Sequence, residues 1–180
     1  MGLQVWSTPQ VPLQIADGTA YASSTTITDV SPGAATSPVT LPGQTLQLGT
    51  TLIIRAAWTA SNTSTPTLLA GFYYGGVAGT ALAATSAITT TTAMTNWQWY
   101  MEYRGVIQAV GTSGKIMGCG QIHVPTSLTA WTIRPIPETA MAQVTVDTTV
   151  AKAITLGLTW GTNSASNTAT CKLFSVETLA

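Results

Sequence analysis

The residues that could carry chemistry in this chain are few and spread out. Acid–base catalysis needs two carboxyl groups, or a carboxyl group and a histidine, held close to one substrate. The chain has one histidine, His123, and six carboxylates, Asp17, Asp29, Glu102, Glu138, Asp147 and Glu177. A Ser–His–Asp arrangement using His123 and Asp147 is conceivable, but the GxSxG nucleophile motif is absent. A carboxylate pair could still be assembled from distant strands; the charge pattern does not indicate one, and we expect no enzyme activity.

Metal and phosphate sites are not indicated either. One histidine and two separated cysteines offer zinc three possible ligands without the short spacings that zinc sites use. Calcium prefers clustered carboxylate oxygens, and the chain has no Asp-rich loop. The glycine-rich segment 75–79 lacks the Lys-Ser/Thr pair of a phosphate loop and is interpreted as a hairpin turn. We therefore expect no cofactor.

Two cysteines, Cys119 and Cys171, do not form a CxxC motif and are too few for a disulfide framework. They could form a disulfide if their strands were neighbours. The favoured interpretation is two small buried apolar residues in a reducing cytosol. Residues 1–17 show no cationic start followed by an apolar run, so we expect synthesis and assembly in the cytoplasm.

The six cations are scattered, with no basic run, at Arg55, Arg104, Arg134, Lys115, Lys152 and Lys172. This distribution argues against nucleic acid as a partner and against attraction to anionic lipid. The uncharged stretch 56–101 could be mistaken for a membrane span. Asn62, Pro66 and many threonines interrupt it, so no membrane partner is expected.

Aromatic side chains are the remaining candidates for binding. Trp97, Trp99, Tyr100 and Tyr103 lie close together, and we expect Tyr73 and Tyr74 on a neighbouring strand. Such a cluster can stack on sugars or anchor a protein partner. Strand alternation instead places most of these residues in the core and leaves Tyr100 outside. Trp6 differs, because it lies in a Pro-containing segment with little regular pattern, where a tryptophan either packs under the domain or anchors on a partner.

Short alternating segments separated by Gly, Pro, Asn and Ser indicate strands throughout, and helix patterns are nearly absent. Residues 1–18 are predicted to form an irregular arm, because prolines interrupt them. Residues 19–180 are predicted to form one domain. The predicted strands are 19–28, 50–60, 67–74, 81–90, 96–110, 115–124, 129–136, 142–147, 153–160 and 168–178. Their number and spacing predict an all-β fold, a single jelly-roll-like antiparallel β-sandwich.

Composition points to association with other proteins. Charged residues are 7% of the chain, against about 25% in typical soluble domains. Formal net charge is zero, and threonine, about a fifth of the chain, supplies much of the polar surface. A β-rich protein with few lysines has little protection against pairing at its strand edges. We therefore expect partner subunits to cover part of its surface.

Three segments together resemble a family of small virion proteins of actinobacteriophage type. They are LPGQTLQLGTTLIIRAAWTASNTSTPTLLAGFYYGGVAGTALA (41–83), NWQWYMEYRGVIQAVGTSGKIMGCG (96–120) and VTVDTTVAKAITLGLTWGTNSASNTATCKLFSVETL (144–179). The resemblance implies a single jelly-roll domain in the virion of a tailed phage, either as capsid decoration or as a minor structural protein. It is carried by strands and turns, so it transfers no functional residues.

Two functions from different classes follow. The first is a capsid decoration protein, expected to be a homotrimer, that binds the major capsid protein or other virion proteins on the outer surface of the head. The second is a tail, baseplate or head-fibre component that binds host-surface carbohydrate; fold alone cannot establish it. The expected partner-binding residues are Leu3, Val5, Trp6, Val11 and Leu13 of the arm, together with Tyr100.

Overall fold

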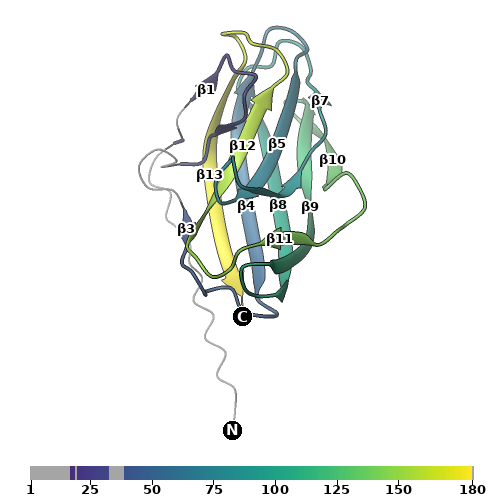
Figure 1. Cartoon of the computed structure of the whole chain (residues 1–180). Coiled ribbons are helices and arrows are strands. Elements are labelled where there is room, and N and C mark those ends of the chain that lie inside the picture. Colours follow the sequence, from purple (N-terminus) through teal and green to yellow (C-terminus); the bar gives the residue numbers. More distant parts are fainter. Residues whose placement is uncertain (1–16, 19, 33–38, 180) are drawn as a thin grey trace.

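The structure, a computed structural model, describes residues 17–18, 20–32 and 39–179, and this part of the chain is all-β. Two antiparallel sheets face each other and enclose one apolar core (Figure 1), so the predicted β-sandwich is confirmed. The jelly-roll connectivity stays a prediction. The strands are β1 (Tyr21–Ala22), β2 (Thr28–Asp29), β3 (Thr40–Leu41), β4 (Thr51–Ser61), β5 (Thr67–Tyr74), β6 (Thr80–Ala84), β7 (Ile88–Thr89), β8 (Trp97–Ala109), β9 (Gly114–Ser127), β10 (Ala130–Ile136), β11 (Val144–Val146), β12 (Lys152–Trp160) and β13 (Thr168–Leu179).

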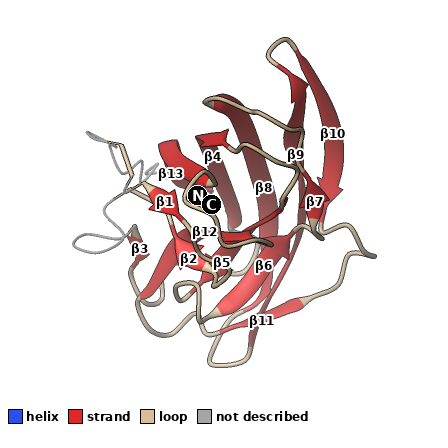
Figure 2. Ribbon diagram, turned by 90° about the horizontal axis from the view of Figure 1, so that it is seen from above, coloured by secondary structure: helices blue, strands red, loops and turns tan. Residues whose placement is uncertain are grey.

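The larger sheet has the strand order β1-β13-β4-β8-β9-β10, with β11 paired to β9. The smaller sheet has the order β2-β12-β5-β6, with β3 paired to β12 and β7 paired to β5. Figure 2, seen from above, shows these two layers and the long β9–β10 hairpin extending beyond the smaller sheet. The long strands β4, β8 and β9 therefore form the middle of the larger sheet. Within the described residues, no helix has the length and apolar character needed to cross a membrane.

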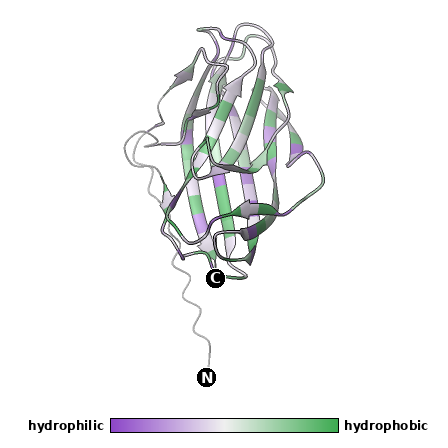
Figure 3. Ribbon diagram, viewed as in Figure 1, coloured by the Kyte–Doolittle hydropathy of each residue, from purple (hydrophilic) through white to green (hydrophobic). Residues whose placement is uncertain are grey.

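Alternation of side chains along the strands builds the core. In β8, Trp99, Met101 and Tyr103 are at most 1% exposed, whereas Glu102 and Arg104 between and beyond them face solvent. Successive residues of a strand point to opposite faces of the sheet, so this pattern fixes which face is buried. Figure 3 shows the same alternation of apolar and polar residues along the long strands.

Aromatic rings fill the space between the sheets. Trp58 of β4 and Trp99 of β8 are direct cross-strand partners, and their rings stack with centroids 5.9 Å apart. Phe72 of the smaller sheet meets Phe174 of the larger sheet, with ring centroids 6.4 Å apart. Such pairs add to the free energy gained from burial. They join the two sheets into one core.

Two glycines make room for Tyr103 on the inner face of the larger sheet. A Cβ atom on Gly105 would lie 2.5 Å from the Tyr103 hydroxyl oxygen, and one on Gly118 would lie 2.6 Å from it. Gly105 and Gly118 are cross-strand partners on β8 and β9. The phenol ring therefore covers a place where two side chains are missing, which keeps the middle of the sheet closely packed.

The β9 strand continues through Pro125, although we expected a strand end at that proline. Pairing between β8 and β9 begins at Tyr100 and His123, so Pro125 lies beyond the part of β9 that β8 covers. There β9 pairs only with β10, and Pro125 faces Trp131 across the hairpin. A proline, which lacks a backbone N–H, is tolerated where one edge of the strand has no ladder partner.

Two predicted strands are each divided in the structure. The segment 19–28 contains β1, which pairs with β13, and β2, which pairs with β12 in the other sheet. Ser23 between them has a φ of 54°, a left-handed conformation that ends an extended strand. The segment 81–90 contains β6 and β7, which both pair with β5. The other predicted strands agree with the structure to within a few residues.

The two sheets differ in how their outer faces are covered. On the smaller sheet, the Tyr73 ring lies against Gly71 and Gly157, and Ile27 from the segment before β2 lies against Gly157 as well. On the larger sheet, most outward side chains of β4, β8 and β9 are partly or fully exposed, Ile53 and Pro125 being buried exceptions. The outer face of the larger sheet is therefore the open surface of the sandwich.

Candidate functional site

The register of the larger sheet arranges its outward side chains in rows. Arg55 pairs with Glu102, and Glu102 pairs with Gln121, on β4, β8 and β9. The next row contains Leu173, Ala57, Tyr100, His123 and Ile133, from β13 to β10. Directly opposite residues of an antiparallel pair point to the same face with their Cβ atoms close together. The outer face thus carries a polar row beside a mostly apolar and aromatic row.

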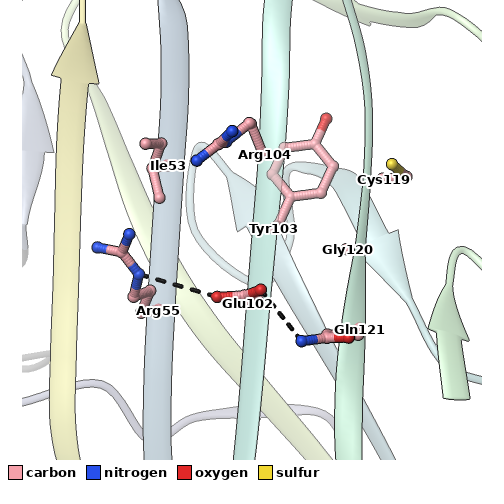
Figure 4. A pocket seen from close by; sticks show the side chains of 8 residues that line it. All are labelled: Ile53, Arg55, Glu102, Tyr103, Arg104, Cys119, Gly120 and Gln121. Atoms are coloured by element: carbon pink, nitrogen blue, oxygen red, sulfur yellow. Dashed lines mark hydrogen bonds and ion pairs between the residues drawn. The ribbon is translucent and has the colours of Figure 1, made fainter. Parts of the chain in front are cut away.

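An ion-pair cluster with its hydrogen bonds joins four strands on this face, β13, β4, β8 and β9. The Arg55 Nη1 donates to the Glu177 Oε1 at 2.6 Å, and the Arg55 Nε lies 3.9 Å from the Glu102 Oε2. Gln121 Nε2 donates to the Glu102 Oε1 at 3.2 Å, and the Tyr100 hydroxyl donates to the Glu102 Oε2 at 3.0 Å. Figure 4 shows Arg55 and Gln121 on either side of Glu102. These mutual bonds hold the side chains in place.

The cluster brings together two carboxylates, Glu102 and Glu177, that are far apart in sequence. An acid–base pair would need both carboxyl groups turned toward a shared substrate. Here Arg55 lies between them and binds both, so each already has a cationic partner. This arrangement favours a fixed hydrogen-bonding surface over a catalytic pair. Glu138 is used elsewhere, in an ion pair with Arg134.

Tyr100 lies on the outer face, as the alternation predicts. Its ring meets the His123 imidazole edge to face, with centroids 5.4 Å apart. Burial, followed by the hydrogen bond to Glu102, raises the pKa of the Tyr100 phenol above its ordinary value. The phenol is therefore neutral at physiological pH and acts as a hydrogen-bond donor.

Tyr73 and Tyr74 lie on β5 in the other sheet, so the expectation that they neighbour β8 is wrong.

A hollow of about 370 Å³ opens on the outer face beside the ion-pair cluster. Its lining comes from β4, β8 and β9 and consists of Ile53, Arg55, Glu102, Tyr103, Arg104, Cys119, Gly120 and Gln121 (Figure 4). Arg104 is exposed and forms no ion pair within the described residues. Its guanidinium is a fork of N–H donors suited to planar carboxylates.

The β9–β10 hairpin adds exposed apolar side chains to the same face. Trp131 is 50% exposed and Ile133 is 58% exposed. The Trp131 indole N–H points to the backbone oxygen of Gln98 at 3.4 Å, so the indole reaches across β9 toward β8. An aromatic ring held over a sheet in this way can support a ligand ring.

A second apolar surface lies at the end of the sandwich where the chain terminates (Figure 1). We call it the end patch and define it by its exposed side chains: Leu48, Val106, Val110, Val150 and Leu179. Backbone hydrogen bonds join the loops that carry them, from Gly49 to Ile107, Gln44 to Thr148 and Thr148 to Gly111. Thr51 pairs with both Val106 and Leu179.

Most of the predicted partner-binding residues fall outside the described part of the chain. These are Leu3, Val5, Trp6, Val11 and Leu13. Tyr100 is described and belongs to the outer face. At the end of the predicted arm, Asp17 forms an ion pair with Lys172, and the Gly18 N–H donates to the Cys171 carbonyl at 2.9 Å.

The two cysteines do not pair, because β4 and β8 separate β9 from β13. Cys171 is buried as expected, whereas Cys119 is exposed in the hollow, so the expectation of two buried thiols is wrong for Cys119. Within residues 17–18, 20–32 and 39–179, the structure holds no group of three or more His, Cys, Asp or Glu side chains that could bind a metal ion.

The sequence pattern did not predict Trp131, Arg104 or the end patch as candidate binding residues. The segment 129–136 was predicted as a strand, but Ala130 to Ile133 are all exposed, so its alternation does not separate an inner from an outer face. The unpaired state of Arg104 depends on the register with β4 and β9. No single segment of the sequence contains that information.

No protein-family model, no curated protein and no solved structure matches the chain. The virion setting therefore rests on the sequence resemblance alone.

Proposed function

We propose that the protein is a non-enzymatic structural subunit that packs its end patch against other protein subunits in the particle of a tailed bacteriophage. In the form that the resemblance favours, it is a capsid decoration protein that self-associates, as a homotrimer, and binds the major capsid protein on the outer surface of the head. Its action is mechanical, because a subunit that binds only the assembled shell stabilises that shell by mass action.

The end patch is the observation that carries this proposal. Leu48 is 71% exposed, Val110 is 51% exposed and Val150 is 46% exposed. The segments that hold them, 42–50, 106–114 and 148–151, contain no charged residue, and the nearest charges along the chain are Lys115, Asp147 and Lys152. A soluble monomer rarely exposes a contiguous apolar surface without charges, and such a surface typically marks a protein interface.

The end patch supplies part of the free energy of association. Burying a Leu or Val side chain fully contributes about 1.5–3 kcal/mol. Five such residues, already about half buried, contribute roughly 4–7 kcal/mol before the entropy lost on association is subtracted. A specific complex buries about 1,600 Å², so the polar backbone and threonine side chains around the end patch must be buried as well.

Charged substitutions in the end patch test the proposal. We expect the wild-type protein to form a defined oligomer, and we expect Leu48→Lys combined with Val110→Lys to shift it at least about tenfold toward monomer. The reason is that each ammonium group would have to be desolvated inside the interface. Sedimentation velocity over a concentration series measures the shift, and co-sedimentation with phage heads measures attachment.

A matched control places the same charge elsewhere. Thr63→Lys changes an exposed residue in the β4–β5 loop, at the opposite end of the sandwich, and should leave the oligomer unchanged. A wild-type protein that stays monomeric at high concentration and never co-sediments with heads contradicts the proposal. Equal behaviour of the double variant and the Thr63→Lys control contradicts the role of the end patch.

A further inference from the structure

We propose that the outer face of the larger sheet binds an acidic glycan, with sugar rings against Trp131 and Tyr100 and a sugar carboxylate on Arg104. This site adjoins the end patch at Val106, the outward residue of β8 that follows Arg104, but it does not depend on the proposed assembly role. It lies on β8, β9 and β10, whereas the end patch lies mainly on loops at one end of the sandwich.

The shape of the surface fits an elongated ligand. Gln98, Tyr100, Glu102 and Arg104 are alternate residues of β8 and point outward. Alternate residues are about 6.8 Å apart along a strand, so these four form a track of about 20 Å. Trp131 lies at the Gln98 end of this track and the hollow with Arg104 lies at the other end. The track is long enough for a short oligosaccharide.

The aromatic end of the track offers apolar surface that a sugar ring can cover. Trp131 keeps half of its area exposed while its indole N–H is directed at the Gln98 backbone oxygen. Tyr100 is held on one side by His123 and at its hydroxyl by Glu102. Rings fixed in this way lose little conformational entropy when a ligand binds.

The middle of the track supplies hydrogen-bonding groups of both kinds. Glu102 accepts, Gln121 can donate and accept, and the Arg55 guanidinium donates. Sugar hydroxyls donate and accept, so they can pair with each of these groups. The mutual bonds of the cluster position them before any ligand arrives.

The charge on this face favours a weakly charged ligand. The two arginines, Arg55 and Arg104, balance the two carboxylates, Glu102 and Glu177, and Arg55 contacts both of the latter. A polyanion would gain little from the surroundings of the hollow, where these two acids and two bases balance. Among the described residues that line the hollow, Arg104 is the cation without an ion pair, so a single carboxylate there is the charge that the site can accept. Lys115, an outward cation farther along β9, donates to Thr145.

The test uses defined oligosaccharides as probes. The acidic probes are glucuronosyl-xylobiose and 3′-sialyllactose, which each carry one carboxylate, on a uronic acid and on a sialic acid respectively, and the matched neutral probes are xylotriose and lactose. Binding is followed by the shift of the Trp131 indole N–H resonance and by protection of Cys119, which lines the hollow, from a thiol reagent. We expect dissociation constants between about 0.1 and 5 mM for at least one acidic probe.

Two substitutions test which part of the ligand binds at each end of the track. Arg104→Gln should weaken the acidic probe about tenfold and leave any neutral binding unchanged, because it removes only the cation. Trp131→Ala should weaken every bound probe about tenfold. Controls are Lys152→Gln, which removes a cation on the smaller sheet, and Leu128→Ala, which removes an exposed apolar side chain at the hairpin tip.

Each outcome decides the proposal. Binding of an acidic probe that both track variants weaken and both controls retain supports it, and the probe that binds identifies a uronic or a sialic acid. No binding at millimolar probe, equal binding of acidic and neutral probes, or equal loss in the controls overturns it. The Leu48→Lys, Val110→Lys variant should still bind, so failure of the glycan site and failure of the end patch are distinguishable.

Discussion

Two tyrosines of β8 lie on opposite faces of the larger sheet, and this difference determines what each side chain contributes. Tyr103 is buried, and burial raises the pKa of its phenol far above the ordinary value. Tyr100, three residues earlier on the opposite face, has its hydroxyl bonded to Glu102. One tyrosine therefore packs the core, and the other contributes a neutral donor to a polar surface. The same residue type acquires its role from the face on which it lies.

The two thiols differ in the same way, which gives a first prediction. Burial raises the pKa of the Cys171 thiol to about 12, whereas Cys119 is exposed. The thiolate is the reactive form. We expect a maleimide to label one thiol per folded chain at pH 8 and two in denaturant. At about pH 9 we expect Cys171 to remain unlabelled in the folded protein, because this pH is still well below the pKa of its thiol. Mass spectrometry of intact protein counts the labels.

The variant Cys119→Ser is the control for this labelling experiment. It should take up no label in the folded state and one label in denaturant, since only Cys171 then remains. Rapid labelling of two thiols in the folded wild-type protein would contradict the burial of Cys171.

Some residue assignments were accessible from the sequence and others were not. The inward positions of β8 follow from period-two alternation, which is a local property of the chain. Period-two alternation along β4 places Ile53 on the outer face, yet it is only 5% exposed. Its cross-strand partners are Arg104 and Glu177, whose long side chains cover outward positions of the sheet. Alternation predicts the direction of a side chain, and its burial depends on neighbours from other strands.

At the scale of elements, the strands themselves were predictable and their order was not. Alternation and turn residues located β4, β5, β8, β9, β12 and β13. The ion-pair cluster needs β13, β4, β8 and β9 to be adjacent in that order, and the sequence separation of Arg55 and Glu177 is 122 residues. Long-range pairing is decided by the collective burial of both sheets. For this reason the sequence could not indicate the candidate site.

A buried asparagine links β4 to the segment before β8 and supplies a second prediction. Asn62 is 3% exposed, its Nδ2 donates to the Thr90 Oγ1 at 2.7 Å, and its Oδ1 accepts from the Met94 N–H at 3.1 Å. We expect Asn62→Ala to lower the free energy of unfolding by about 2–4 kcal/mol, because it leaves buried polar groups without partners. Urea unfolding followed by tryptophan fluorescence measures this change.

Asn163→Ala provides the comparison, because Asn163 is exposed in the loop between β12 and β13. Its effect should stay within about 0.5 kcal/mol, as for most surface substitutions. If both variants lose the same stability, Asn62 does not have the structural role assigned to it.

At the scale of the whole molecule, the protein has a neutral, charge-poor surface with two distinct regions. The outer face of the larger sheet carries most of the paired charges on this sheet, and the end patch carries none in its loops. Long-range electrostatic repulsion between copies is weak at zero net charge. In the proposed assembly, we therefore expect apolar burial at the end patch to govern the contacts between copies.

The third prediction concerns how association of the protein changes with temperature and with salt. Apolar burial is driven mainly by entropy near 25 °C and weakens on cooling, whereas surface ion pairs weaken with added salt. We expect association of the wild-type protein to strengthen between about 5 and 30 °C by roughly two- to fivefold. We expect less than about a twofold loss between about 0.05 and 0.5 M NaCl, because screening acts only on charges. Sedimentation velocity at each condition gives the constants. A steep loss of association in salt, with no gain on warming, would mean that the charged outer face and not the end patch holds the subunits together.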